Sequence, residues 1–147
     1  MTRGAPEYEV LPHTADVGVL VRAPSARELF ERAAAAMFDL MVDVTRVGEG
    51  LAAGAVLEDV EVEAPDREAL LVAWLGELLG RAMVDGVIYA AFDISRLEDT
   101  RLLARVWGKP FESAGQEFRT EIKAVTYHHL LVSEDREGWT ARVIFDI

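Results

Sequence analysis

Apolar and polar residues alternate at the end of the chain in the pattern of a β-hairpin. From Trp139 to Ile147 every second residue has an apolar side chain, which is the period of a strand with one buried face. Residues 125–132 are also rich in strand-forming types. The charged segment 133–138 between them contains a glycine, as hairpin connections do. We therefore expect a hairpin whose second strand runs to the end of the sequence.

Two other segments have helical spacing. Ser25 and Glu28 form the pattern of a capping box, in which the serine caps the helix and the glutamate lies three residues later. Asp66 is expected to cap the second helix. The first helix should end near Val42 or Asp43, and the second at Asp85–Gly86.

Each helix carries an apolar stripe, which is typical of a face that packs into a core. For this reason Trp74 is assigned to the core and given no function. The stripes comprise Leu29, Ala33, Ala36, Met37, Leu40 and Met41 in the first helix and Leu70, Leu71, Trp74, Leu75, Leu78, Leu79 and Met83 in the second.

The rest of the chain is predicted to form strands and loops. Two helices among six or more strands, without strict alternation, indicate an α+β fold. We expect a single domain over residues 1–147, with the two helices packed on one face of a mostly antiparallel or mixed sheet. The further strands are expected at 8–11, 17–23, 56–64, 87–94 and 101–107, and the loops at 45–54 and 108–115.

The composition excludes several classes of protein. The hydrophobic fraction is 51% and cysteine is absent, so disorder, disulfides, thiolate zinc sites and cysteine nucleophiles are not expected. No apolar stretch is long enough to cross a membrane, and the first residues lack the apolar region of a secretory signal. We expect a cytoplasmic protein.

The chain is strongly acidic, with a formal net charge of -11. This disfavours direct nucleic-acid binding, because lysine and arginine supply most of the affinity for a phosphate backbone. It favours a basic protein surface or a cation as partner. An acidic surplus also serves simply to keep a protein soluble.

Carboxylates at the two ends of the chain are candidate metal ligands. If Ile147 is ordered, its free carboxylate lies beside that of Asp146, and a hard divalent cation prefers such oxygen ligands. Asp16 lies in a turn-like segment, where a carboxylate normally bonds nearby backbone N–H groups. The alternative is that Asp16 meets Asp146 and the terminal carboxylate, in which case a cation would offset their repulsion.

The histidines and Lys123 are more ambiguous. His13 is a candidate ligand for a transition metal, or a residue that bonds the backbone or orients Asp16. His128 and His129 are neighbours on a predicted strand, so their side chains should point to opposite faces and not share a metal easily. Lys123 is one of two lysines among 15 basic residues. It is either an ordinary surface charge or a site that needs a compact ammonium group.

Two short motifs lie near the two ends of the chain. The first is His-Thr-Ala-Asp at residues 13–16. The second is Lys-Ala-Val-Thr-Tyr-His at residues 123–128, followed by a strand that ends in Phe-Asp-Ile at residues 145–147. Together they resemble the two signatures of the archease family. The pattern between them is compatible with the family, so the resemblance covers nearly the whole chain.

The resemblance implies a metal site and a protein partner. It implies that Asp16, Asp146 and the terminal carboxylate of Ile147 bind Ca²⁺, Mg²⁺ or Mn²⁺, and that Lys123 is functionally required. His128 falls inside the second motif, and we assign a supporting role to His128 and His13.

The implied partner is the tRNA-splicing RNA ligase, which joins 3′-phosphate or cyclic-phosphate ends to 5′-hydroxyl ends. An archease would act like a chaperone, helping this ligase to become guanylylated and to turn over repeatedly, and would not itself be the catalyst.

Two other function classes fit the same residues. A small hydrolase or phosphotransferase would use a carboxylate-bound metal to activate water, although no motif indicates its substrate pocket. A metal-free interaction module is the third possibility. Turnover of phosphoester substrates distinguishes the hydrolase, and calcium or manganese binding distinguishes the archease-like protein from the metal-free module.

Overall fold

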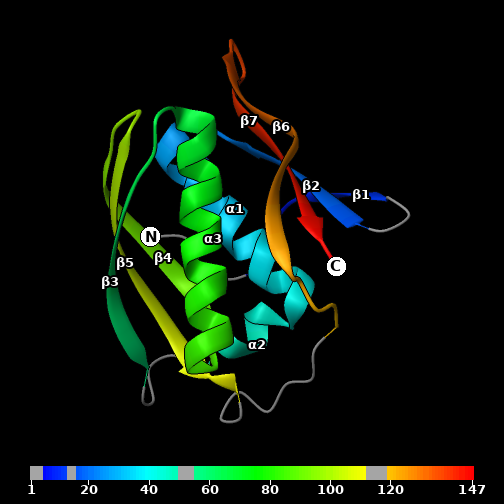
Figure 1. Ribbon diagram of the computed structural model, residues 1–147, viewed down its shortest axis with the longest axis vertical. Coiled ribbons are helices and arrows are strands. Elements are labelled where there is room, and N and C mark those ends of the chain that lie inside the picture. Colours follow the sequence, from blue (N-terminus) through cyan, green and yellow to red (C-terminus); the bar gives the residue numbers. More distant parts are fainter. Residues whose placement is uncertain (1–4, 13–15, 50–54, 112–118) are drawn as a thin grey trace.

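The computed structural model describes residues 5–12, 16–49, 55–111 and 119–147. Over these ranges the chain forms three helices and seven strands, shown in Figure 1. In chain order they are β1 (Glu9–Pro12), β2 (Asp16–Ala23), α1 (Ala26–Met41), α2 (Val44–Glu49), β3 (Val56–Glu63), α3 (Arg67–Asp85), β4 (Val87–Leu97), β5 (Arg101–Pro110), β6 (Ala124–Asp135) and β7 (Gly138–Asp146).

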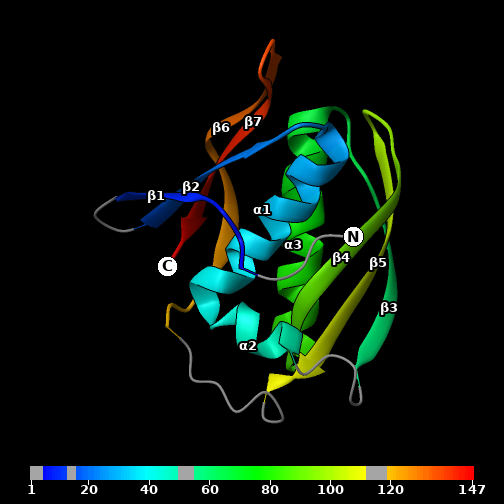
Figure 2. The same cartoon turned by 180° about the vertical axis from the view of Figure 1, so that it is seen from behind.

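The strands form two antiparallel sheets with the long helices between them. One sheet has the order β1-β2-β7-β6 and the other has the order β3-β5-β4. Helix α1 contacts β2 and β4, and α3 contacts β6, β3 and β4, so each helix touches both sheets. Figures 1 and 2 show this layering from opposite sides. The α+β class is confirmed, and the finer arrangement is two sheets around the helices.

Both long helices begin at the predicted caps. The Ser25 hydroxyl accepts a hydrogen bond from the backbone N–H of Glu28 at 3.2 Å, and the Asp66 carboxylate accepts one from that of Ala69 at 2.8 Å. Such side-chain acceptors satisfy N–H groups that a helix leaves unpaired at its start. Gly86 ends α3 in the left-handed conformation, with φ 66°.

The helical stripes form the core, as expected. Trp74 is fully buried and its indole N–H donates to the backbone carbonyl of Phe30 at 2.9 Å. A buried indole with its polar atom satisfied is a packing residue. Leu40 is only half-buried, and Met83 is 59% exposed, so the prediction that Met83 belongs to the core is wrong.

Two predicted loops contain regular structure. Helix α2 occupies part of the segment 45–54, because Val44 and Val47 lie three residues apart and both are buried. Strand β5 continues through Gly108, where a Cβ would lie 2.4 Å from the carbonyl oxygen of Ile88. This glycine permits a close approach of two strands and does not mark a loop. Residues 50–54 and 112–115 of the predicted loops lie outside the described residues.

The C-terminal hairpin is confirmed, with a tighter turn than predicted. Strands β6 and β7 pair from Ala124 opposite Asp146 to Asp135 opposite Gly138, so the strands enclose only Arg136 and Glu137. Within the described chain, no helix has both the length and the apolar character needed to cross a membrane.

Candidate functional site

Asp16 and Asp146 lie directly opposite each other on neighbouring strands. Asp16 is the first residue of β2 and not part of a loop, and the register of the β2–β7 ladder pairs it with Asp146. Opposed residues in such a ladder share one face, with Cβ atoms about 4.5–5.5 Å apart. The structure therefore brings the two predicted carboxylates together at one end of the sheet.

The carboxylates lie on the face of the sheet that points away from the helices. The next residues along the two strands, Val17 and Phe145, pack against the core from the opposite face. The neighbouring pair on the carboxylate face is Gly18 and Ile144, and a Cβ on Gly18 would lie 2.7 Å from Cδ1 of Ile144. Ile144 thus covers Gly18 and fixes the two strands closely beside the aspartates.

Lys123 is held at the same place by its backbone. Its N–H donates to the carbonyl oxygen of Asp146 at 2.7 Å, and the following residue, Ala124, pairs with Asp146 in the β6–β7 ladder. The Lys123 side chain is exposed, and Ile147 is 40% exposed. The backbones of four predicted site residues therefore lie close together where β2, β6 and β7 adjoin.

The arrangement suits a cation, although the metal remains a prediction. Two carboxylates at this spacing repel each other unless a proton or a cation lies between them. Among the described residues, no group of three or more His, Cys, Asp or Glu side chains could hold a metal. A site here would depend on Asp16 and Asp146 with a non-side-chain ligand such as the terminal carboxylate of Ile147.

The histidines do not join this cluster in the described chain. His13 lies outside the described residues. His128 lies in the irregular part of β6 between the pairs Thr126–Ile144 and Leu131–Arg142, so it is displaced along the strand from Asp146. Its supporting role remains a prediction.

The expectation that His128 and His129 point to opposite faces is wrong. Their ring centroids are 4.5 Å apart, with the rings edge to face at 70°. His129 has a positive φ of 50°, and the β6–β7 register shifts at this point. The strand alternation on which the expectation rested is broken by this bulge.

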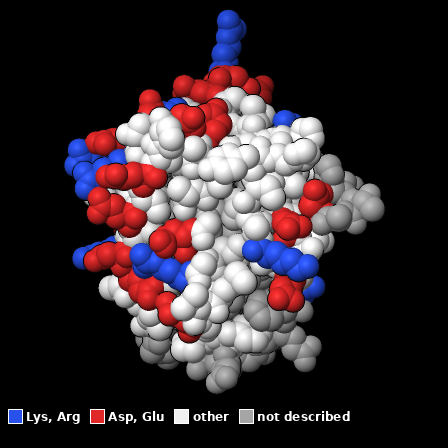
Figure 3. All heavy atoms as spheres, viewed as in Figure 1, with Lys and Arg blue, Asp and Glu red and all other residues white. Residues whose placement is uncertain are grey.

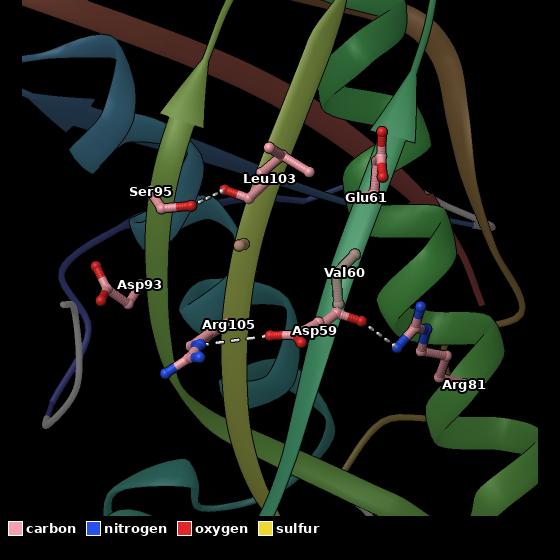
Figure 4. A pocket seen from close by; sticks show the side chains of 9 residues that line it. Asp59, Val60, Glu61, Arg81, Asp93, Ser95, Leu103 and Arg105 are labelled. Atoms are coloured by element: carbon pink, nitrogen blue, oxygen red, sulfur yellow. Dashed lines mark hydrogen bonds and ion pairs between the residues drawn. The ribbon is translucent and has the colours of Figure 1, made fainter.

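A second candidate site is an open hollow of about 560 Å³ on the β3–β5–β4 sheet, shown in Figure 4. Its polar groups are engaged with one another. Arg105 pairs with Asp59 at 3.4 Å, Arg81 donates to the Asp59 carbonyl at 3.1 Å, and the Ser95 hydroxyl donates to the Leu103 carbonyl at 3.3 Å. A serine bonded to a carbonyl has no base to activate it, so this hollow lacks a nucleophilic centre.

Charge is unevenly distributed over the face shown in Figure 3. Acidic and basic side chains gather at the left, over the β3–β5–β4 sheet, and further groups of both lie at the top and at the right, while the middle is largely uncharged. Several arginines pair with carboxylates, such as Arg101 with Glu61 at 2.6 Å. On this face the acidic side chains are therefore distributed over several regions.

Comparisons with known proteins identify the family. The model of the archease protein family (MTH1598/TM1083) matches residues 8–147. Protein archease of Methanosarcina mazei is 37% identical over 145 residues, covering 96% of each chain. Protein archease of Pyrococcus abyssi is 33% identical, covering 95% of this chain and 98% of the relative. The solution structure of Methanobacterium thermoautotrophicum protein 1598 matches with a TM-score of 0.75 and 32% identity, covering 95% of this chain and 98% of that one. The chain therefore belongs to the archease family.

Proposed function

We propose that this archease is an accessory protein of an RNA ligase that joins 3′-phosphate or cyclic-phosphate ends to 5′-hydroxyl ends in tRNA splicing and RNA repair. It acts in the cytoplasm by promoting guanylylation of the ligase and its multiple turnover, and it is not the catalyst. The observation that supports this best is the pairing of Asp16 with Asp146, because it unites the aspartates of both family-like motifs.

The metal part of the proposal assigns ligands to named residues. Asp16, Asp146 and the terminal carboxylate of Ile147 hold one Ca²⁺, Mg²⁺ or Mn²⁺, because each of these ions prefers oxygen ligands. When bound, the cation supplies a positive charge at the end of the β2–β7 ladder, in an otherwise acidic protein. The carboxylates then serve to hold and orient that charge toward the partner.

Lys123 is the third element of the proposed site. Its backbone N–H donates to the Asp146 carbonyl, and its side chain is exposed. A lysine ammonium is a compact charge with three donors, which suits contact with a carboxylate or a phosphate at close range. We assign Lys123 to the contact with the ligase during guanylylation.

The charge of the protein supports a protein partner over direct RNA binding. With a net charge of -11, the archease would be repelled by an RNA backbone and attracted to the basic surface that an RNA-binding enzyme presents. The RNA contacts therefore belong to the ligase in this proposal.

The test measures turnover of the ligase, with the ligase in catalytic amounts and the RNA substrate in excess over it. Wild-type archease should raise both guanylylation and the number of turnovers, and Asp146→Asn should not. Glu134→Gln is the matched control, because it removes one exposed carboxylate from the far end of the same hairpin. Equal stimulation by wild type and Asp146→Asn would refute the site. Phosphoester turnover by the archease alone would instead favour a metal-dependent hydrolase.

A further inference from the structure

We propose that His128 and His129 form a second metal site, selective for borderline transition metals such as Zn²⁺ and Ni²⁺. The site is distinct from the carboxylate pair, and its existence does not rest on the proposed function. Two histidines that are adjacent in a regular strand cannot offer both rings to one ion, because their side chains point to opposite faces. The structure removes this obstacle.

The bulge in β6 turns the two imidazoles toward each other. Regular pairing with β7 stops at Thr126 opposite Ile144 and resumes at Leu131 opposite Arg142. His129 has φ 50° inside this stretch, and the ring centroids are 4.5 Å apart. Among the described residues other than glycine, His129 alone has a positive φ. The juxtaposition is therefore a local departure from strand geometry.

Side-chain hydrogen bonds hold the bulge on both sides of the histidines. The guanidinium of Arg142 donates from Nε to the His129 carbonyl at 2.8 Å. The Thr126 hydroxyl donates to the Ile144 carbonyl at 2.9 Å and accepts from the backbone N–H of His128 at 3.3 Å. A left-handed conformation is unfavourable for a residue with a Cβ and persists where the surroundings hold it. Thr126 and Arg142 supply such support here.

The pair has the chemistry of an open metal site. Both side chains are exposed, and neither imidazole forms a hydrogen bond to another described residue. A zinc ion binds imidazole nitrogen at about 2.0–2.1 Å, so rings this close can reach one ion by rotating about their side-chain bonds. Water would complete the coordination. Imidazole selects borderline metals, whereas carboxylates alone favour Ca²⁺ and Mg²⁺.

The decisive measurement is calorimetric titration of untagged archease with ZnCl₂ in buffer that contains millimolar CaCl₂. Millimolar calcium competes with zinc for sites made of oxygen ligands, so the remaining zinc heat reports on nitrogen ligands such as the two histidines. His129→Asn should weaken zinc binding by at least about 10-fold, in the range seen when a metal site loses a supporting group. Asparagine also tolerates a positive φ, so this variant keeps the bulge, and an unchanged thermal melt confirms its fold. Glu134→Gln, which changes an exposed side chain of the same strand, is the control and should bind zinc like the wild type.

A second variant tests whether the bulge itself builds the site. Arg142→Ala keeps both histidines and removes the donor to the His129 carbonyl. It should weaken zinc binding by about 10- to 100-fold, as other losses of outer support do. Zinc binding by His129→Asn equal to that of the wild type would overturn the site. Loss of binding in Glu134→Gln would also overturn it, because the ligand would then lie elsewhere. Unchanged affinity in Arg142→Ala would overturn the role of the bulge and leave only chelation by two flexible histidines.

Discussion

Asp16 and Asp146 face each other across β2 and β7, as the end pair of that ladder and on the face of the sheet that points away from the helices. The two residues come from opposite ends of the chain. Their juxtaposition depends on the register of two strands, and Ile144 packed over Gly18 in the next pair supports that register. The aspartates are thus positioned by the packing of the sheet and not by a flexible loop.

The aspartate pair predicts a specific effect on metal affinity. Asp16→Asn and Asp146→Asn should each weaken Ca²⁺ or Mn²⁺ binding by about 10-fold or more. Loss of a group that only supports a ligand already has an effect of this size, and loss of a ligand should have at least as large an effect. Without metal, Asp146→Asn should leave the melting temperature equal or slightly higher, because it removes one of two repelling charges. Calorimetry and thermal melts measure both effects. Full affinity in both variants would show that the ion binds elsewhere.

A C-terminal extension tests the third proposed ligand. Adding residues after Ile147 replaces its free carboxylate with a peptide group while leaving β7 intact. We expect weaker metal binding and weaker ligase stimulation, with little change in the thermal melt. The same extension at the N-terminus is the control. Undiminished stimulation by the C-terminally extended protein would remove the terminal carboxylate from the site.

Gly108 and Gly80 give a matched pair for stability. A Cβ on Gly108 would lie 2.4 Å from the Ile88 carbonyl, whereas one on Gly80 of α3 meets nothing within 4 Å. Gly108→Ala should destabilise by about 1–3 kcal/mol, as overpacking does. Gly80→Ala should stabilise by roughly 0.5–1 kcal/mol, because alanine favours an exposed helix position. Denaturant unfolding measures both, and equal midpoints would contradict the packing at Gly108.

What could be predicted from the sequence was local. Both helices start at the expected caps because Ser25 and Asp66 act within one helical turn. The C-terminal hairpin follows from alternation in one continuous segment. The division into two sheets does not, because it depends on which distant strands pair.

The sequence also led to the expectation that Asp16 and Asp146 lie close together, and their backbone pairing agrees with it, while the metal site itself stays a prediction. The resemblance implied that Asp16 and Asp146 share a site, and the β2–β7 register is what places the two residues opposite each other. The closeness of His128 and His129 was missed, because strand periodicity assumes regular backbone angles. The positive φ of His129 is supported by the hydrogen bond from Arg142, a residue of the neighbouring strand.

Tyr8 predicts a loss of stability at alkaline pH. Burial, and then its hydrogen bond to Asp39 at 2.9 Å, raise the pKa of the Tyr8 phenol above its ordinary value. In the unfolded chain a tyrosine ionises with a pKa of about 10. The stabilisation is therefore fully present below that pH and is lost as the pH rises above it. Tyr8→Phe should lower stability at neutral pH by about 0.5–1.5 kcal/mol and flatten the alkaline decline.

Unfolding midpoints measured from neutral to alkaline pH report this effect. Tyr127→Phe, at a tyrosine that is 65% exposed, is the control and should follow the wild-type profile. Tyr89, whose hydroxyl bonds to Glu58 and whose pKa is also raised mainly by burial, should contribute a similar decline. An alkaline profile unchanged in both Tyr8→Phe and Tyr89→Phe would contradict the assignment.

Lys123 separates a helper from an independent catalyst. If its exposed side chain is only a surface charge, its replacement should change stability by less than about 1 kcal/mol and leave ligase stimulation intact. If it contacts the ligase during guanylylation, Lys123→Ala should keep its fold and lose stimulation. The fold should survive because the bond from residue 123 to the Asp146 carbonyl is made by the backbone. Lys123→Arg should also be impaired, since a planar guanidinium does not replace a compact ammonium at close range.

The assay combines guanylylation and turnover of catalytic amounts of ligase with thermal melts of each variant. Lys109→Ala is the matched control, because it removes the other lysine of the chain from β5 in the opposite sheet. Equal stimulation by wild type, Lys123→Ala and Lys123→Arg would exclude Lys123 from the site. Loss of stimulation with unchanged melts and unchanged calcium affinity would instead assign Lys123 to the ligase contact, because a defect in the fold or in the metal site would alter one of those two measurements.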